Sequence, residues 1–107
     1  MNQGEFTSLI KQAGRTVTLT RGAGSIQPTM ASAVADPEDP ILKDATQDDI
    51  TVRFTQDDFK TGSITKPDRY DRITDADGRT YAIQQVMPLW GLGGQVWGYK
   101  ALIRGNE

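Results

Sequence analysis

The sequence predicts a mainly β protein: a small antiparallel β-barrel or sandwich of five to six strands with a short N-terminal helix and a long mobile loop. Segments in which apolar and polar residues alternate recur along the chain, as in strands with one buried face. An Asp-Gly pair, favoured in tight hairpin turns, separates two of them. The 107 residues suit a single domain over 1–107, and closing the sheet would hide its strand edges.

The helix is expected over residues 3–13. Its apolar residues fall on one face at the spacing i, i+3, i+4 and i+7: Phe6, Leu9, Ile10 and Ala13. Asn2 and Glu5 have the spacing of a capping box, and Gly14 suits the position after the last turn. A helix this short is unstable alone in water, so it must dock on its own domain or on a neighbouring subunit. Phe6 and Ile10 are therefore candidates for a partner interface.

The first half of the chain predicts strands around a long excursion. Residues 15–21 alternate with β-branched side chains and predict a strand, and small residues at 29–35 suit a strand or a short helix. From Asp36 to Asp49 the chain carries two prolines and six acidic residues with one lysine, a composition that disfavours regular structure. Most of residues 22–48 is therefore expected to be an excursion and the most mobile internal segment.

Four more strands are predicted in the second half, at residues 49–55, 70–74, 79–87 and 95–104. Asp77-Gly78 forms the turn between the second and third of these, because glycine adopts positive φ at low cost. Tyr81 and Ile83 share a face, but Val86 lies three residues beyond Ile83. That odd spacing indicates a β-bulge near residues 84–85.

Two loops separate these strands. Residues 56–67 are polar, whereas the glycine-rich residues 88–94 carry three large apolar side chains: Leu89, Trp90 and Leu92. Such side chains on a loop tip are typical of interface anchors, and the alternative is that Trp90 packs back over its own barrel. Trp97 and Tyr99 alternate along the last strand and are predicted to be core residues.

The composition argues against several classes of protein. No Cys and no His occur, which excludes disulfides, thiolate chemistry, the usual zinc sites and His-based triads. A net charge of -2 and a pI of about 5.0 argue against gripping nucleic acid through a basic face. No apolar run approaches the roughly 18–20 residues that span a bilayer, and no signal peptide is visible, so no membrane association is expected.

The acidic residues give no convincing catalytic or metal site. Residues 75–78 resemble the start of a calcium loop but lack the later ligands, so a turn is predicted. Asp48-Asp49 and Asp57-Asp58 could supply a carboxylate pair for a nuclease or glycosidase, but adjacent strand residues point to opposite faces. We therefore expect no enzymatic activity, no cofactor and no metal.

Four acidic residues of the excursion are candidates for a loop or channel role: Asp36, Glu38, Asp39 and Asp44. The ordinary interpretation is a solvated loop. In a ring around passing DNA, the same negative charge would repel phosphate and keep the duplex from adhering.

One motif points to a known family. Residues 66–73 and 76–86 read as two short strands around the Asp-Gly turn, and a final strand follows at residues 95–104. This arrangement resembles the β-hairpin of the small head–tail joining (head-completion or tail-attachment) proteins of long-tailed bacteriophages. The resemblance covers roughly residues 48–104, and the matching residues are Asp71, Arg72, Ile73, Gly78, Arg79, Tyr81, Ile83 and Val86.

The resemblance implies a structural virion protein without enzymatic activity, made in the cytoplasm of the bacterial host and located at the head–tail interface. It implies a small β-barrel that joins the portal-side connector to the tail as a subunit of a homo-oligomeric ring, with a hexamer favoured. DNA would pass through the ring without specific binding, and the isolated chain could be a monomer.

A function of a different class stays open: a monomeric SH3-like or OB-like module that binds a peptide or a nucleic acid. Trp90, Trp97 and Tyr99 could line an aromatic groove for a peptide. Binding of single-stranded nucleic acid also needs a cationic groove, which the net charge does not favour. The mass of the protein in solution would discriminate the module from the ring subunit.

Overall fold

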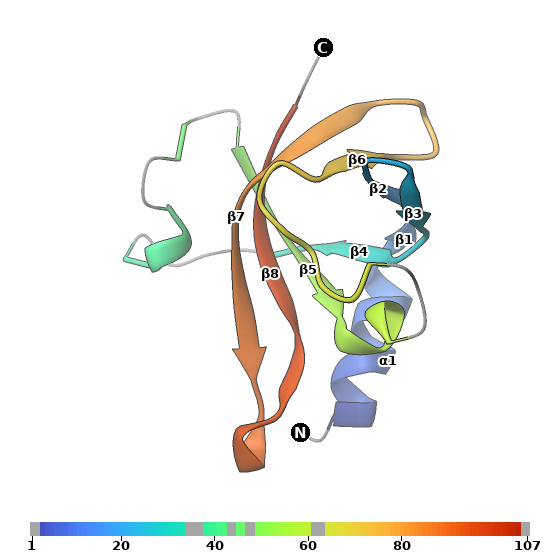
Figure 1. The fold of residues 1–107 in the computed structure, drawn as a ribbon. Helices are drawn as coiled ribbons and strands as arrows, with labels where there is room; N and C mark the ends of the chain where they lie inside the picture. Colours follow the sequence, from blue (N-terminus) through green and yellow to red (C-terminus); the bar gives the residue numbers. More distant parts are fainter. Residues whose placement is uncertain (1–2, 34–37, 43–44, 47–48, 61–63, 106–107) are drawn as a thin grey trace.

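The computed structural model describes residues 3–33, 38–42, 45–46, 49–60 and 64–105. One helix, α1 (Gln3–Ala13), packs against a curled, barrel-like antiparallel sheet, so the predicted mainly β class is confirmed (Figure 1). The strands are β1 (Arg15–Thr16), β2 (Thr18–Arg21), β3 (Gly24–Ile26), β4 (Thr29–Ser32), β5 (Asp49–Thr55), β6 (Arg72–Thr74), β7 (Thr80–Trp90) and β8 (Val96–Gly105). Their order across the sheet is β1-β4-β5-β8-β7-β6-β2-β3. Within these ranges, no helix has the length and apolar composition to cross a membrane.

The first hairpin brings the two ends of the sheet together. β1 continues into β2 across Val17, whose N–H donates to the carbonyl of Pro28 (3.0 Å), and β4 continues β3 in the same register. One arm of this hairpin pairs with β6 and the other with β5. The breaks near Val17 and Pro28 divide each arm in two, so the sheet has 8 strands where five to six are predicted.

The structure corrects the predicted excursion over residues 22–48. Its first part belongs to the hairpin, because Gly22 adopts φ 58° and reverses the chain at once. The strand expected at 29–35 is present as β4, which ends at Ser32. Further on, the 3-10 helix η1 (Pro40–Leu42) packs against β7 and β8 with Ile41 buried. The start of the segment is therefore part of the sheet, and η1 is packed on it.

The core fills the inside of the curled sheet. Its buried members are Val17, Leu19, Met30, Val52, Phe54, Phe59, Ile64, Ile73, Tyr81, Ile83, Tyr99, Ala101 and Ile103. Phe59 and Ile64 correct the prediction of a polar loop at residues 56–67, because the 3-10 helix η2 (Gln56–Phe59) directs Phe59 inward. The Phe59 ring meets Phe54 and Tyr99 edge-on at 5.8 and 5.6 Å. Isolated apolar residues in a polar segment leave no periodic signal.

Residues on the outer face of the sheet are also buried, because α1 and η1 pack against it. Thr51 and Leu102 are cross-strand partners next to the core residues Val52, Ala101 and Ile103, yet both are buried on the opposite face. η1 packs against β7 and β8, while α1 packs against β4, β5 and β8. Ile10 is the buried residue of α1, so the helix docks on its own chain.

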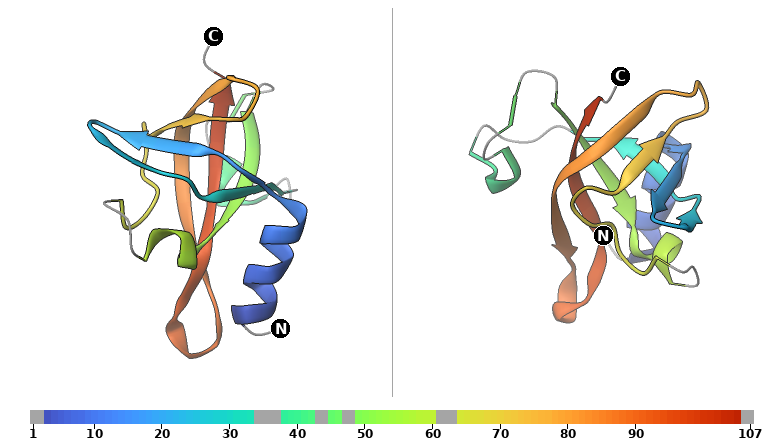
Figure 2. Two further views of the ribbon diagram at one scale, coloured as in Figure 1. Left: turned by 90° about the vertical axis from the view of Figure 1, so that its right-hand side faces the viewer. Right: turned by 45° about the horizontal axis from the view of Figure 1, so that its top comes forward.

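β7 and β8 form a long hairpin that extends past the rest of the sheet (Figures 1 and 2). β5 accompanies β8 only as far as the pair Thr55 and Gly98, and among the described strands none flanks β8 on that side beyond this pair. The predicted glycine-rich loop is shorter than expected, because β7 continues to Trp90 and the tip contains the 3-10 helix η3 (Leu92–Gly94).

The β-bulge predicted near residues 84–85 is confirmed. The register of β7 against β8 shifts between Ile83 and Gln85. Because the bulge adds one residue to β7, Ile83 and Val86 both face inward although they are three positions apart. Val86 packs against the core.

Candidate interaction surfaces

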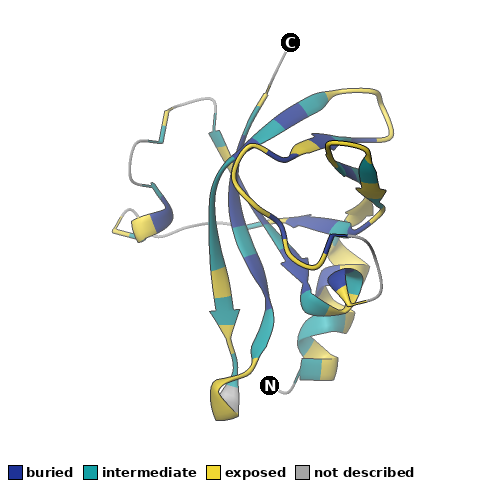
Figure 3. Ribbon diagram, viewed as in Figure 1, coloured by how far each residue is buried: buried dark blue, intermediate teal, exposed yellow. Residues whose placement is uncertain are grey.

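The tip of the β7–β8 hairpin is largely exposed (Figure 3), but its two tryptophans differ in their burial. Trp90 ends β7 and is 66% exposed. Trp97 is half-buried with its ring 6.2 Å from that of Phe6 in α1, and a Cβ at Gly91 would overlap the Trp97 ring. The prediction that Trp97 is a core residue is therefore wrong: it connects the hairpin to α1 outside the inner cluster, whereas Tyr99 is buried in that cluster as predicted.

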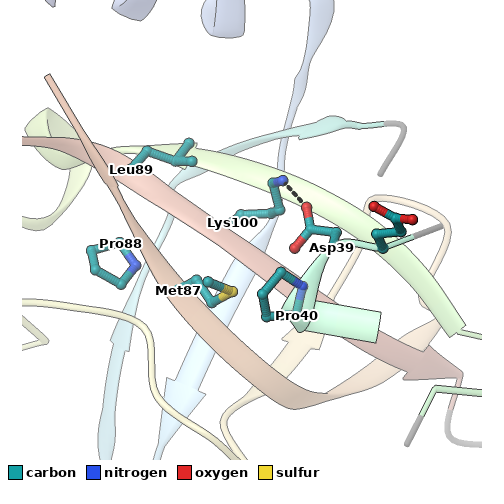
Figure 4. Close-up of a pocket in the computed structure, with 7 residues that line it drawn as sticks. Asp39, Pro40, Met87, Pro88, Leu89 and Lys100 are labelled. Carbon is teal, nitrogen blue, oxygen red and sulfur yellow. Dashed lines mark hydrogen bonds and ion pairs between the residues drawn. The ribbon is translucent and has the colours of Figure 1, made fainter. Parts of the chain in front are cut away.

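A pocket of about 620 Å³ opens beside the same hairpin (Figure 4). It is lined by Glu38, Asp39, Pro40, Met87, Pro88, Leu89 and Lys100. Met87 and Leu89 alternate along β7, and Met87 faces Lys100 across the strand pair. The pocket therefore joins two groups that the sequence predicts separately, the acidic residues of the excursion and the apolar residues of the hairpin.

Asp39 attaches the η1 segment to the sheet. Its carboxylate accepts hydrogen bonds from Lys100 Nζ (2.5 Å) and from the N–H of Ile41 (3.0 Å). The bond from Lys100, and then that from Ile41, holds the pKa of Asp39 below its ordinary value. Asp39, predicted as an acid of a solvated or channel-facing loop, is thus paired within the chain.

The other predicted site residues are scattered. Leu89 is half-buried in the pocket wall, and Glu38 is exposed at its rim. Phe6 is half-buried beneath the hairpin tip and Ile10 is buried on the sheet, so α1 uses both within its own chain. Outside the described residues or side chains lie Leu92, Asp36 and Asp44.

The hairpin motif of residues 66–86 forms a structural framework. Asp71 is 3% exposed and accepts hydrogen bonds from Nε (2.7 Å) and Nη2 (2.6 Å) of Arg21, which raise the pKa of that guanidinium. The Asp75 carboxylate accepts the backbone N–H groups of Asp77 and Arg79 at 3.0 Å each. The second network is the turn that the sequence predicts in place of a calcium loop.

Sequence reasoning missed a second exposed aromatic residue, Tyr70. It is 73% exposed with φ 74°, and the Arg69 guanidinium carbon lies 5.0 Å from its ring centroid. The turn at Tyr70 corrects the strand predicted at residues 70–74, which begins at Arg72. The available signal was an aromatic residue between charged residues just after Pro67, where no alternation supports a strand.

The described carboxylates of the two acidic pairs have structural contacts. Asp49 accepts a hydrogen bond from Arg104 Nε (2.7 Å), which lowers the pKa of Asp49. Asp58 accepts the N–H of Thr29 (2.9 Å), and Asp57 forms an exposed ion pair with Lys60 (3.1 Å). In the part of the chain that the structure describes, no three metal-ligating side chains gather in one place.

Comparisons with protein families, with curated proteins and with solved structures give no match for this chain. Its function is therefore inferred from the hairpin motif and from the surfaces around it.

Proposed function

We propose that this chain is a structural protein of a bacteriophage or prophage that joins the head connector to the tail as a ring subunit. The β7–β8 hairpin carries the proposal: the strand pair that completes the joining-protein motif extends past β5 and ends in the exposed Trp90. Tryptophan is enriched among the residues that dominate protein interfaces. We propose that Trp90 anchors this chain to a connector or tail protein.

The hairpin is suited to hold such an anchor rigidly. β7 pairs with β8 almost throughout its length, and Trp97 packs on Phe6 of α1. Gly98 allows a close approach of β5 and α1, since a Cβ there would overlap the carbonyl of Phe54. A pre-organised element loses little conformational entropy on binding. Trp90 would therefore engage its partner without refolding of the hairpin.

The proposed ring surrounds DNA without specific binding to it, and the resemblance favours six copies. The net charge of -2 supports this part of the proposal, because a surface that grips phosphate needs an excess of Lys and Arg. The expected location is the head–tail interface of the virion.

Virion analysis in a phage or prophage that encodes the chain tests this function. We expect mass spectrometry to detect the protein in purified virions, and deletion of its gene to leave filled heads and free tails. The wild-type gene should restore joined particles, whereas Trp90→Ala should restore fewer while the purified variant stays folded. Normal numbers of joined particles after deletion would refute the function.

The pocket supports a second candidate, a monomeric module that binds a peptide. Met87, Leu89 and Pro40 supply apolar walls, and Glu38 adds a carboxylate at the rim. That combination suits an apolar peptide segment flanked by basic residues. A chain that stays monomeric in the presence of connector and tail proteins, and whose peptide binding is abolished by Met87→Glu, would favour the module over the ring subunit.

A further inference from the structure

The turn around Tyr70, here the Tyr70 turn (residues 68–71), displays its aromatic side chain under backbone strain. A φ of 74° is rare for a bulky residue, and such strain persists only where surrounding contacts impose it. The N–H of Tyr70 donates to the carbonyl of Ile83 (2.8 Å), and the Asp71 carboxylate accepts the N–H of Asp68 (2.8 Å). These bonds hold the turn in shape while the Tyr70 ring stays in solvent.

The surroundings of the Tyr70 turn are cationic. Arg21 and Asp71 form an ion pair (2.6 Å), so their charges cancel. The remaining exposed charges in residues 66–72 are three cations and one carboxylate: Lys66, Arg69, Arg72 and Asp68. Arginine and tyrosine are both enriched at the energetic centre of protein interfaces. The turn therefore presents a rigid aromatic side chain with excess positive charge.

The pocket beside Met87, here the Met87 pocket, has the complementary character. Its apolar walls come from Met87, Leu89 and Pro40. The ion pair between Asp39 and Lys100 (2.5 Å) adds no net charge to the pocket. The exposed carboxylate of Glu38 leaves the rim with a negative charge. An aromatic side chain flanked by an arginine thus fits the pocket in both polarity and charge.

We propose that the Tyr70 turn of one copy of this chain docks in the Met87 pocket of the next copy. This inference rests on the proposed function, because it supplies the contact between neighbouring subunits of the ring. The two surfaces consist of different residues, so the contact is head-to-tail, the kind that closes into a ring when the rotation per subunit allows it. Tyr70 fills the apolar pocket and Arg69 faces Glu38, which leaves Trp90 for the connector or tail protein.

Site-directed cross-linking tests the contact, since the chain has no natural cysteine. The experiment mixes full-length Arg69→Cys protein with full-length Glu38→Cys protein and adds a short bis-maleimide. We expect several-fold more mixed dimer than either variant forms with itself. Gln12→Cys, on the exposed side of α1, is the matched control and should give only background dimer with each partner. All three substitutions are at exposed positions, so the fold should persist.

A charge exchange adds a second measurement. Arg69→Glu or Glu38→Arg alone should reduce self-association in sedimentation at high protein concentration, and the double variant should restore it. Background yields of the mixed dimer would overturn this contact. If the protein is nevertheless found in virions and its deletion separates heads from tails, the proposed function stands and only the contact is wrong. If the mixed dimer forms but the protein is absent from virions, the function is wrong and the chain self-associates for another purpose.

Discussion

At the scale of single residues, buried carboxylates determine the shape of the segment that carries the motif. Asp71 binds Arg21, 50 positions away in sequence, and thereby fixes the start of β6 against β2. Asp75 binds the N–H groups of its own turn. Removing one partner of a buried, hydrogen-bonded carboxylate is costly, because the group left behind stays buried without its full set of hydrogen bonds.

Asp71→Asn should lower the free energy of unfolding by about 2 kcal/mol, because the amide cannot accept both guanidinium bonds as an anion does. Chemical denaturation of the two proteins measures the difference. Asp77→Asn is the control, since Asp77 is exposed and Asn-Gly also suits a tight turn. Equal losses of unfolding free energy in both variants would show that the bonds between Asp71 and Arg21 contribute nothing particular to stability.

The two tryptophans should respond differently to truncation. Trp97→Ala removes the contact with Phe6 and should cost about 2 kcal/mol, less than a fully buried tryptophan because the side chain is only half-buried. Trp90→Ala should change stability by no more than about 0.5 kcal/mol, since the side chain is exposed. Thermal melts measure both changes in stability. A large loss of stability in Trp90→Ala would show that the Trp90 ring packs against the protein and does not project into solvent.

At the scale of elements, the long hairpin depends on close packing at Gly98 and on the attachment of η1. Gly98 lies where β8, β5 and α1 converge, and both the carbonyl of Phe54 and the ring of Phe6 occupy the space of a Cβ. η1 contacts the hairpin base at β7 and β8, whereas α1 contacts β8 together with β4 and β5. The pair Asp39 and Lys100 attaches η1 to the hairpin. The hairpin base is thus held by two elements that are distant in sequence.

Gly98→Ala should destabilise the protein by about 3 kcal/mol, because a backbone carbonyl cannot move aside as a flexible side chain can. Denaturant titration gives the difference. Gly105→Ala is the matched control in the same strand, where no described residue other than its chain neighbours has an atom within 4 Å of the added Cβ. A tolerated Gly98→Ala would show that β5 and β8 can separate locally.

The attachment of η1 should weaken in acid. The pKa of Asp39 is lowered in the folded chain, so its contribution to stability is complete above its ordinary value of 3.8 and is lost as the pH falls through the folded value. The protection factors of the Ile41 and Leu42 amides, which compare the measured exchange with the intrinsic rate at the same pH, should therefore fall below about pH 4. Asp39→Asn should show low protection at every pH, and an unchanged acid response in this variant would assign the effect to another group.

At the scale of the whole molecule, the two exposed aromatic residues divide the proposed contacts. In the proposal, Trp90 at the exposed hairpin tip contacts a connector or tail protein, and Tyr70 on a separate turn contacts the neighbouring copy. A subunit of such a ring needs separate surfaces for its neighbours and for the proteins above and below the ring, because each subunit must bind its own kind as well as other proteins.

The isolated chain should be a monomer or a weak oligomer that forms a ring only on its connector. Its mean hydropathy of -0.51 is low, and a small contact through one aromatic side chain holds neighbours only weakly without a template. Analytical ultracentrifugation of the chain alone and with the connector measures this. A chain that stays monomeric on the assembled connector would contradict the ring.

Local pattern was sufficient for much of this fold. The spacing of Phe6, Leu9 and Ile10 predicts α1 over the residues that it occupies, and the step from Ile83 to Val86 predicts the bulge in β7. Both features depend on a chain segment of a few residues, and the hydrophobic period records which face of such a segment is buried. The Asp77-Gly78 turn, with φ 83° at Gly78, belongs to the same group.

By itself, the sequence determined the mainly β class, the N-terminal helix, the turn and bulge of the motif, and the apolar residues near the hairpin tip. Only the tertiary structure decided that Phe59 enters the core, that Trp97 supports the tip, and that Asp39 meets Lys100 across 61 positions. Periodicity shows that a face is buried but does not identify the element that covers it. The Met87 pocket and the strained Tyr70 turn exist because distant segments constrain each other, which no local pattern records.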